Sequence, residues 1–347
     1  MKRRGSASGV LAICIVLAIA LAGWARQVEG QDVGQQETPG AGSAPSPLEP
    51  REVQVVLFMA DLVSIDGPNQ SFYADVFLAA SWQDPELAAD TDEPRMFDLE
   101  DIWHPTLLIV NERGASAKLP DVARVGPDGS VVYVQRFNGT FATSMDLRRF
   151  PLDRQSLRVW IVALRTGLVP VRLTPNPTVA NLLAESLTIS DWSILGATLG
   201  EREYTATPTG QGLSGVALGV EVKRQANYYI IQVLIPLAAI VMMAWSVFWI
   251  PTSVTPTRVG VVVTTMLTLI AYRFMLANHV PRLPYLTRLD WFMLGATMLV
   301  VLTLFSMAGT SYLIGRDEEA VVKKIDRVGR VAYPLVFAVY SLVVWLR

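Results

Sequence analysis

The sequence contains few of the residues from which enzyme and metal sites are usually built. In 347 residues it has one cysteine, Cys14, and two histidines, His104 and His279. Cys14 lies in an apolar N-terminal run, so the rest of the chain has no thiol for a disulfide, a nucleophile or a metal ligand. No nucleophile–base spacing or metal-ligand spacing accompanies the histidines. We therefore expect no catalytic residue, no metal site and no cofactor.

Charged residues are also scarce. They make up 17% of the chain, the formal net charge is -2, and hydrophobic residues make up 51%. Without a basic excess, a nucleic-acid partner is not expected. Residues 226–256 contain no charged side chain at all, which is long enough to cross a bilayer. The composition predicts a membrane protein with a sizeable soluble part.

The N-terminus has the pattern of an export signal. Lys2, Arg3 and Arg4 precede the apolar run 10–22, and Ala25 offers a small residue for cleavage. We predict a signal peptide over residues 1–25, with an uncleaved anchor helix as the alternative. Residues 26–50 are rich in Gly, Pro, Gln and Ser and predict a disordered leader.

Residues 51–223 have the alternation of β-strands. Short runs of alternating apolar residues are separated by turn sequences such as 66–69 (DGPN) and 127–129 (PDG). Their spacing predicts one antiparallel β-sandwich of immunoglobulin-like type, placed on the periplasmic or extracellular side by the export signal.

Residues 224–347 predict an all-α four-helix transmembrane bundle. The expected helices cover about 227–250, 257–280, 288–314 and 330–347. Four crossings after an exported domain leave the C-terminus outside. The intervening loop 315–330, which carries five Arg and Lys residues, then faces the cytoplasm.

The second of these segments has a polar stripe along one side. Steps of three or four residues, which follow one helical face, connect the following side chains: Gly260, Thr264, Leu267, Ala271, Phe274 and Asn278. Threonine hydroxyls on such a face can contact a hydrated ion, and a ring of Leu can close a narrow path by dewetting. The alternative is a packed helix whose threonines bond back to their own backbone.

Three motifs resemble one family. Residues 143–157 (TSMDLRRFPLDRQSL) resemble the signature loop of the Cys-loop receptor superfamily, with Thr143 and Leu157 in place of its two cysteines. Residues 224–250 are similar to the junction and first membrane helix of the glycine and GABA receptor branch. Residues 256–268 are similar to the pore helix of the same branch. On these motifs the chain is identified as a member of the bacterial pentameric ligand-gated ion channels.

This resemblance implies a homopentamer in the bacterial plasma (inner) membrane, with five second helices around an ion pathway. It implies a multi-pass subunit opened by a small extracellular ligand and conducting inorganic ions. Thr257 and Arg258 would form the inner mouth, where cation-conducting relatives carry a glutamate ring; an alternative role for Arg258 is anchoring lipid headgroups. The absence of a carboxylate there favours anions. A cation-selective channel, or a proton-gated one using His279, remains open.

The resemblance also implies a coupling zone between the two domains. Arg224 precedes the first helix, and a buried cation there needs a carboxylate partner, for which Asp153 and Asp66 are the candidates. The expected coupling residues are Asp66, Phe150, Pro151, Asp153, Arg224, Pro281 and Arg282.

Ligands of this family bind between subunits. The corresponding candidates here are Tyr73, Phe77, Arg136 and Tyr204. Several expected aromatic positions carry aliphatic residues (Val110 and Leu164), which disfavours a cage for an ammonium ligand. A carboxylate held by Arg136 is the other option. A membrane-anchored sensor without conduction is a competing hypothesis, disfavoured by four crossings of which one is polar-striped.

Overall fold

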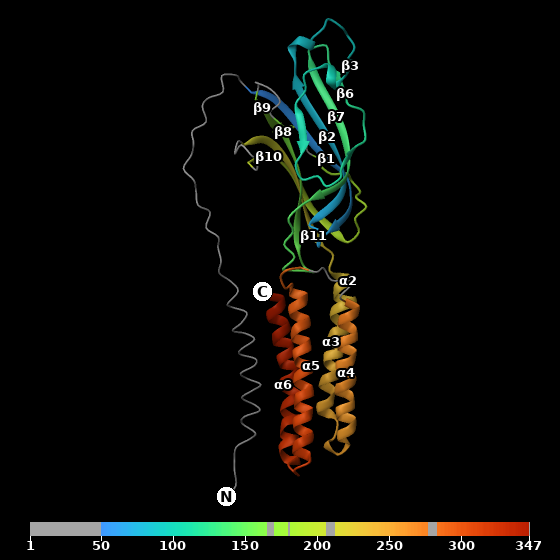
Figure 1. Cartoon of the computed structure of the whole chain (residues 1–347), viewed down its shortest axis with the longest axis vertical. Coiled ribbons are helices and arrows are strands. Elements are labelled where there is room, and N and C mark those ends of the chain that lie inside the picture. The colour runs from blue at the N-terminus through green and yellow to red at the C-terminus, as the bar shows by residue number, and fades with distance from the viewer. Residues whose placement is uncertain (1–49, 165–169, 180, 206–211, 277–282, 347) are drawn as a thin grey trace, which may run out of the picture.

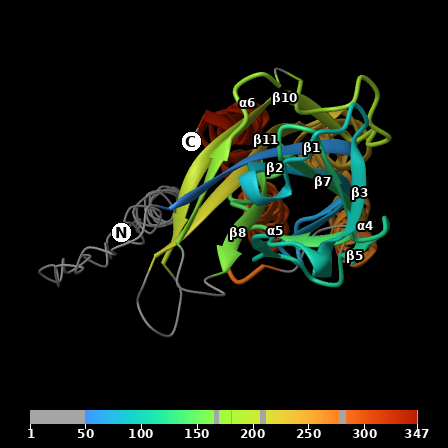
Figure 2. The same ribbon diagram turned by 90° about the horizontal axis from the view of Figure 1, so that it is seen from above.

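The computed structural model describes residues 50–164, 170–179, 181–205, 212–276 and 283–346. A β-domain and a bundle of helices are stacked along one long axis (Figure 1). Seen from above, the β-domain lies over helices α4 and α5 (Figure 2). The predicted signal peptide and all of the predicted leader except residue 50 lie outside the described residues.

Within the described residues, eleven strands form two sheets. The larger has the order β3-β6-β7-β2-β1-β9, with β5 also paired to β7, and the smaller has the order β10-β11-β8-β4. The strand bounds are β1 Arg51–Asp66, β2 Ser71–Gln83, β3 Arg95–Asp98, β4 Thr106–Ile109, β5 Ser116–Ala117, β6 Val122–Val125, β7 Ser130–Ala142, β8 Arg154–Leu164, β9 Val171–Pro175, β10 Trp192–Tyr204 and β11 Leu213–Arg224.

The β-sandwich predicted from alternation is confirmed. In the first half of β1 every second side chain is buried, namely Val53, Val55, Leu57 and Met59, as expected when one face of a strand packs on a core. The DGPN segment forms the turn between β1 and β2, whose register closes at Asp66↔Ser71.

One pairing departs from the antiparallel prediction. β9 pairs with β1 in parallel, from Arg51↔Val171 to Val55↔Pro175. The sheet is therefore mixed. Because β9 reaches this edge after a long path, its direction is set by the connection and cannot be read from the alternation of either strand.

In the part of the chain that the structure describes, four helical segments are long and apolar enough to cross a membrane. The first consists of α2 Asn227–Tyr229, the π-helix η3 Ile230–Leu234, α3 Ile235–Ser246 and the short turn η4 Val247–Trp249. The others are α4 Thr255–Leu276 (after the turn η5 Thr252–Val254), α5 Arg288–Ile314 and α6 Glu319–Leu346. The four-helix architecture predicted from the sequence is confirmed.

The fourth helix begins earlier than the sequence suggested. α6 starts at Glu319, inside the stretch 315–330 that was expected to be a loop. Glu319 lies in its first turn and pairs with Lys323, whose Nζ is 3.1 Å from Glu319 Oε2. Such i,i+4 pairs and a buried Val322 support a helix despite the high charge of this stretch. Residues 277–280, the expected end of the second helix, lie outside the described residues.

Candidate functional site

Helix α4 presents one face to the surface of the subunit. Leu267 and Phe274 are 62% and 74% exposed, whereas Val262 and Leu269 on the other side are 0% and 1% exposed. All five described residues of the predicted pore stripe are exposed: Gly260, Thr264, Leu267, Ala271 and Phe274. Asn278 lies outside the described residues. Since the face combines small, polar and large apolar groups, it differs from a uniform lipid-facing surface.

The threonines of α4 divide into two kinds. Thr265 is fully buried and its hydroxyl donates to the carbonyl of Val261, at 2.8 Å; Thr268 donates to Thr264 O at 2.8 Å. These two follow the packing alternative, in which a hydroxyl bonds to its own helix. For the Thr264 hydroxyl no hydrogen bond is found among the described residues.

The structure corrects the expected position of Arg258. Its side chain is buried inside the helical bundle and forms an ion pair with Asp326 of α6, through Nη2 and Oδ1. It lines no exposed face and does not reach outward to lipid headgroups. The partner was missed because α6 was expected to begin after Asp326. Thr257, the other inner-mouth candidate, is exposed in the first turn of α4.

Another arginine, Arg330 of α6, lies near the pair of Arg258 and Asp326. Arg330 Nε donates to the carbonyl of Phe248 at 3.0 Å, and Trp245 Nε1 donates to Arg330 O at 3.1 Å. The guanidinium stacks over Trp249, 4.7 Å from the ring centre. The lower part of α6 is thus joined to the segment between α3 and α4 as well as to the base of α4.

At the domain junction, Arg224 pairs with Asp153. Arg224 Nε is 2.8 Å from Asp153 Oδ1, and Nη2 is 3.2 Å from Oδ2. Asp153 is buried, the Arg224 side chain is only 11% exposed, and Arg224 also stacks on Trp192 with 4.1 Å between the guanidinium and the ring centre. The second candidate partner was wrong: Asp66 is exposed and accepts hydrogen bonds from Asn69 of its own turn.

The loop 143–153 contacts the helices directly. The Phe150 ring meets Tyr229 of α2 edge to face, with centroids 4.7 Å apart, and Pro151 beside it is buried. The Leu147 amide donates to the Tyr285 hydroxyl at 3.1 Å, and the Arg288 amide donates to Arg148 O at 2.9 Å. The sequence pattern did not indicate that Tyr229, Tyr285 and Arg288 make these contacts. Pro281 and Arg282 lie outside the described residues.

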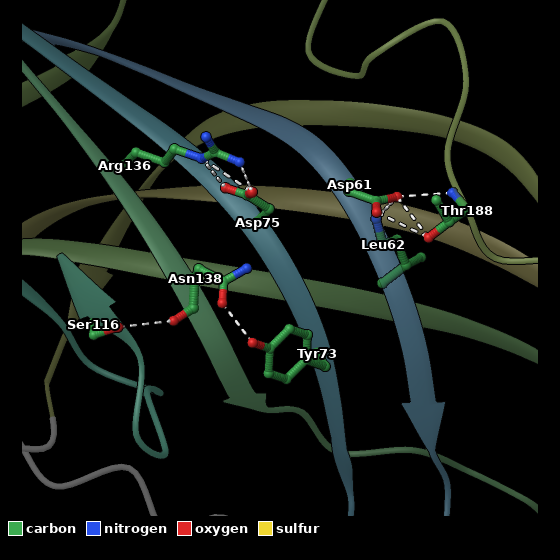
Figure 3. Close-up of polar contacts among 8 residues, drawn as sticks. All are labelled: Asp61, Leu62, Tyr73, Asp75, Ser116, Arg136, Asn138 and Thr188. Atoms are coloured by element: carbon green, nitrogen blue, oxygen red, sulfur yellow. Dashed lines mark hydrogen bonds and ion pairs between the residues drawn. The ribbon is translucent and has the colours of Figure 1, made fainter. Parts of the chain in front are cut away.

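Three of the four ligand candidates, Tyr73, Phe77 and Arg136, lie on the paired strands β2 and β7. Figure 3 shows Tyr73 and Arg136 with their partners. Arg136 Nε is 2.9 Å and 3.1 Å from the two carboxylate oxygens of Asp75, and its guanidinium lies 5.4 Å from the Phe77 ring centre. The hydrogen bond to Asp75 is the main reason that the pKa of Arg136 lies above its usual value. Tyr73 donates through its hydroxyl to Asn138. Arg136 is therefore already paired, although its side chain stays 45% exposed.

Tyr204 lies apart from this cluster. It belongs to β10 of the smaller sheet and meets Trp160 of β8 edge to face, with centroids 6.1 Å apart. Within one chain the structure does not bring Tyr204 to Arg136. Trp160 was not singled out from the sequence, because alternation in a strand does not show which aromatic faces which neighbour. Among the described residues no group of three or more His, Cys, Asp or Glu side chains could hold a metal ion.

A β-sandwich followed by four membrane helices, one with an exposed mixed face, defines the class of membrane receptor channels. Two family models match the chain: the neurotransmitter-gated ion-channel ligand binding domain over residues 41–161, and the neurotransmitter-gated ion-channel transmembrane region over residues 233–320. The chain belongs to this family, the pentameric Cys-loop superfamily of ligand-gated ion channels.

Curated relatives agree with this assignment. The chain is 24% identical over 340 residues to the "Proton-gated ion channel" of Gloeobacter violaceus, which covers 96% of this chain and 91% of the relative. It is 28% identical over 294 residues to the "Gamma-aminobutyric acid receptor subunit beta-4" of Gallus gallus, covering 81% of this chain and 59% of the relative. A "Gamma-aminobutyric acid receptor subunit beta-like" of Drosophila melanogaster is 28% identical over 301 residues, covering 80% of this chain and 60% of the relative. The chain thus spans about 60% of the length of these two receptor subunits.

Proposed function

We propose that five copies of this chain form a homopentameric channel in a bacterial inner membrane, with α4 of each subunit lining the ion pathway. The observation that carries the proposal is the exposed face of α4. Its large apolar residues, Leu267 and Phe274, are left uncovered by the subunit while the opposite face is packed. A ring of five such helices gives this face a shared lumen to line.

In this arrangement Leu267 and Phe274 form the barrier to ions. Rings of large apolar side chains stop conduction because a hydrated ion would lose its water there. Thr264, one turn further in, offers hydroxyls to an ion that has passed the barrier. Opening then requires the helices to move so that the apolar rings widen or turn away.

The junction described above connects ligand binding to this movement. Arg224 ends β11 and is separated from α2 by two residues, while its partner Asp153 holds the loop that carries Phe150. A displacement of either sheet is therefore passed to the first membrane helix through a buried ion pair and an aromatic contact.

For ion selectivity we propose anions. Residues 252–260, at the inner end of α4, contain no carboxylate, and Asp326 is buried against Arg258. A cation-selective or a proton-gated channel is the second candidate. The similarity over 96% of this chain to the relative named as proton-gated favours gating by protons.

For the ligand site we propose the boundary between neighbouring subunits. Tyr73, Phe77 and Arg136 on one subunit would face Tyr204 and Trp160 on the next. The exposed edge of the Arg136 guanidinium suits a small carboxylate, since this group accepts hydrogen bonds from arginine in a fixed geometry.

Reconstitution of the purified chain into liposomes tests these proposals. Ion flux is recorded after a pH step and after addition of each member of a panel of small carboxylates and amines, and reversal potentials are measured under bi-ionic conditions. Flux with a chloride-dependent reversal potential supports the anion channel, and a sodium-dependent one supports the alternative. Absence of flux from both the wild type and Leu267→Ser would favour a sensor without conduction.

A further inference from the structure

The first membrane segment contains a built-in weak point. Between α2 and α3 the backbone forms the π-helix Ile230–Leu234, in which the amide of Ile235 bonds to Ile230 O, five residues earlier. Pro236 follows at once. It has no N–H, so it cannot make the bond that an α-helix would direct from residue 236 to the carbonyl of Gln232. A π-turn followed by proline is a place where a helix bends easily.

A side chain of the pore helix supplies a donor at this point. The Tyr272 hydroxyl of α4 lies 2.8 Å from the carbonyl oxygen of Val233 and 3.1 Å from that of Gln232. A hydroxyl has one proton, which is shared between the two carbonyls with the shorter contact favoured. In the apolar part of a bilayer there is little water to donate hydrogen bonds to these carbonyls. The bond from the Tyr272 hydroxyl is therefore not replaced by one from water.

Tyr272 lies at the height of the proposed gate. It follows Ala271 directly and precedes Phe274 by two residues. Tyr272 is half-buried with its hydroxyl against the π-helix η3, whereas Ala271 and Phe274 are exposed. One turn of α4 therefore carries pore-facing groups on one side and the contact with the π-turn on the other.

We infer that Tyr272 is a positioning residue for gating: its hydroxyl bond to the π-turn of the first membrane segment fixes the orientation of the outer half of α4. The inference rests on the proposed channel function. The π-turn follows the three-residue helix α2, and only Gln225 and Ala226 separate α2 from Arg224 of the domain junction. Motion of the β-domain thus reaches the π-turn first, and Tyr272 transfers it to the pore helix.

The test compares Tyr272→Phe with a matched control in the full-length chain. Tyr340→Phe removes the same kind of bond, from a tyrosine hydroxyl to the carbonyl of Trp291, but between α6 and α5. The first readout is amide hydrogen exchange of residues 230–238 in the reconstituted protein. We expect about fivefold faster exchange in Tyr272→Phe, as for loss of one typical hydrogen bond, and no change in this segment in Tyr340→Phe.

The second readout separates gating from conduction. The midpoint of activation, by whichever pH step or carboxylate opens the wild type, should shift at least about threefold in Tyr272→Phe, with single-channel conductance unchanged. The open probability of the double variant Tyr272→Phe with Leu267→Ser should differ from that of Leu267→Ser alone by a similar factor. Three results would overturn the inference. The first is unchanged amide exchange of residues 230–238 in Tyr272→Phe. The second is faster exchange with an unchanged activation midpoint, and the third is effects of Tyr340→Phe on exchange and midpoint that equal those of Tyr272→Phe. If neither the wild type nor Leu267→Ser conducts, the channel proposal fails on its own, and hydrogen exchange alone decides whether Tyr272 holds the π-turn.

Discussion

Arg224 and Asp153 meet at the junction of the two domains in a bidentate ion pair whose carboxylate is buried: Nε and Nη2 of the arginine lie 2.8 Å and 3.2 Å from the two carboxylate oxygens. Asp153 Oδ2 also accepts from Gln155 Nε2 at 2.7 Å. The Asp153 carboxylate therefore accepts hydrogen bonds from both Arg224 and Gln155. Arg224 supplies two of these bonds and the only positive charge among the two donors.

Removing the arginine should be costly. Arg224→Ala leaves the Asp153 carboxylate buried without its cation, which we expect to lower the free energy of unfolding by about 3–5 kcal/mol. Thermal unfolding of the reconstituted protein and ligand- or pH-activated currents are the measurements. Arg154→Ala, an exposed neighbour on β8, is the control and should behave as wild type. Normal stability and currents in Arg224→Ala would reject the coupling role.

Leu267→Ser should make the closed channel leak. A hydroxyl at this ring lowers the cost of wetting, and we expect the resting flux to rise by about tenfold. The matched control is Leu335→Ser on α6, because Leu335 is also 62% exposed but lies on a helix outside the proposed lumen. A resting flux in Leu267→Ser equal to that of wild type, in liposomes with equal protein content, would show that the gate is elsewhere.

The pair between Arg258 and Asp326 should be structural. Asp326→Ala leaves a buried guanidinium alone and should destabilise the protein by about 3–5 kcal/mol, while the double change Arg258→Met with Asp326→Leu should recover much of the loss. Thermal unfolding in detergent measures both. Lys323→Ala, which breaks only the exposed pair with Glu319, should cost no more than about 0.5 kcal/mol. A double variant as unstable as the single one would contradict this account.

Changes at the β2–β7 cluster should alter ligand response. In Asp75→Asn the Arg136 guanidinium loses its charged partner, so an activating carboxylate from the panel should act at lower concentration. Arg136→Gln should weaken the response about tenfold, as expected for loss of a hydrogen bond to a charged group. Dose–response curves of flux are compared with Arg124→Gln, an exposed arginine on β6. If both Arg136 and Arg124 variants respond as wild type, the ligand site lies elsewhere.

Tyr133 gives the β-domain a defined response to alkaline pH. Burial, together with the hydrogen bond to Asp121 at 2.7 Å, raises the pKa of Tyr133 to about 12 from its ordinary value of 10.0. The folded state therefore holds this proton more tightly than the unfolded state. Its stabilising contribution is complete below pH 10 and declines as pH rises toward 12. The melting temperature should fall over this window, and less steeply in Tyr133→Phe; equal slopes would contradict the shift.

The sequence indicated the parts of this fold that depend on local patterns. Strand alternation around Val53 and Val55, and apolar length in the four helices, follow directly from burial on one face or in lipid. The Arg224–Asp153 pair was also predicted, because a charge next to a membrane helix needs a partner and the loop 143–157 supplied one.

Features that depend on the meeting of distant segments were missed. Asp326 could not be recognised as the partner of Arg258, since the charged start of α6 looks like a loop when its contacts are unknown. The bond from Tyr272 to the π-turn was missed for a similar reason. A tyrosine in a membrane helix gives no sign of which carbonyl on another helix lacks a donor.

The parallel pairing of β1 with β9 determines when the β-domain can be completed. Arg51, the first residue of β1, finds its partner Val171 only about 120 residues later in the chain. Until that segment has emerged, one edge of β1 has free backbone groups that could pair with another chain. Contacts between residues so far apart in the sequence slow folding, because the entropy cost of closing the loop is met before the strands pair. We therefore expect new chains to need protection of the unpaired edge of β1 until β9 has formed. Variants that weaken β9 should aggregate before they assemble in the membrane.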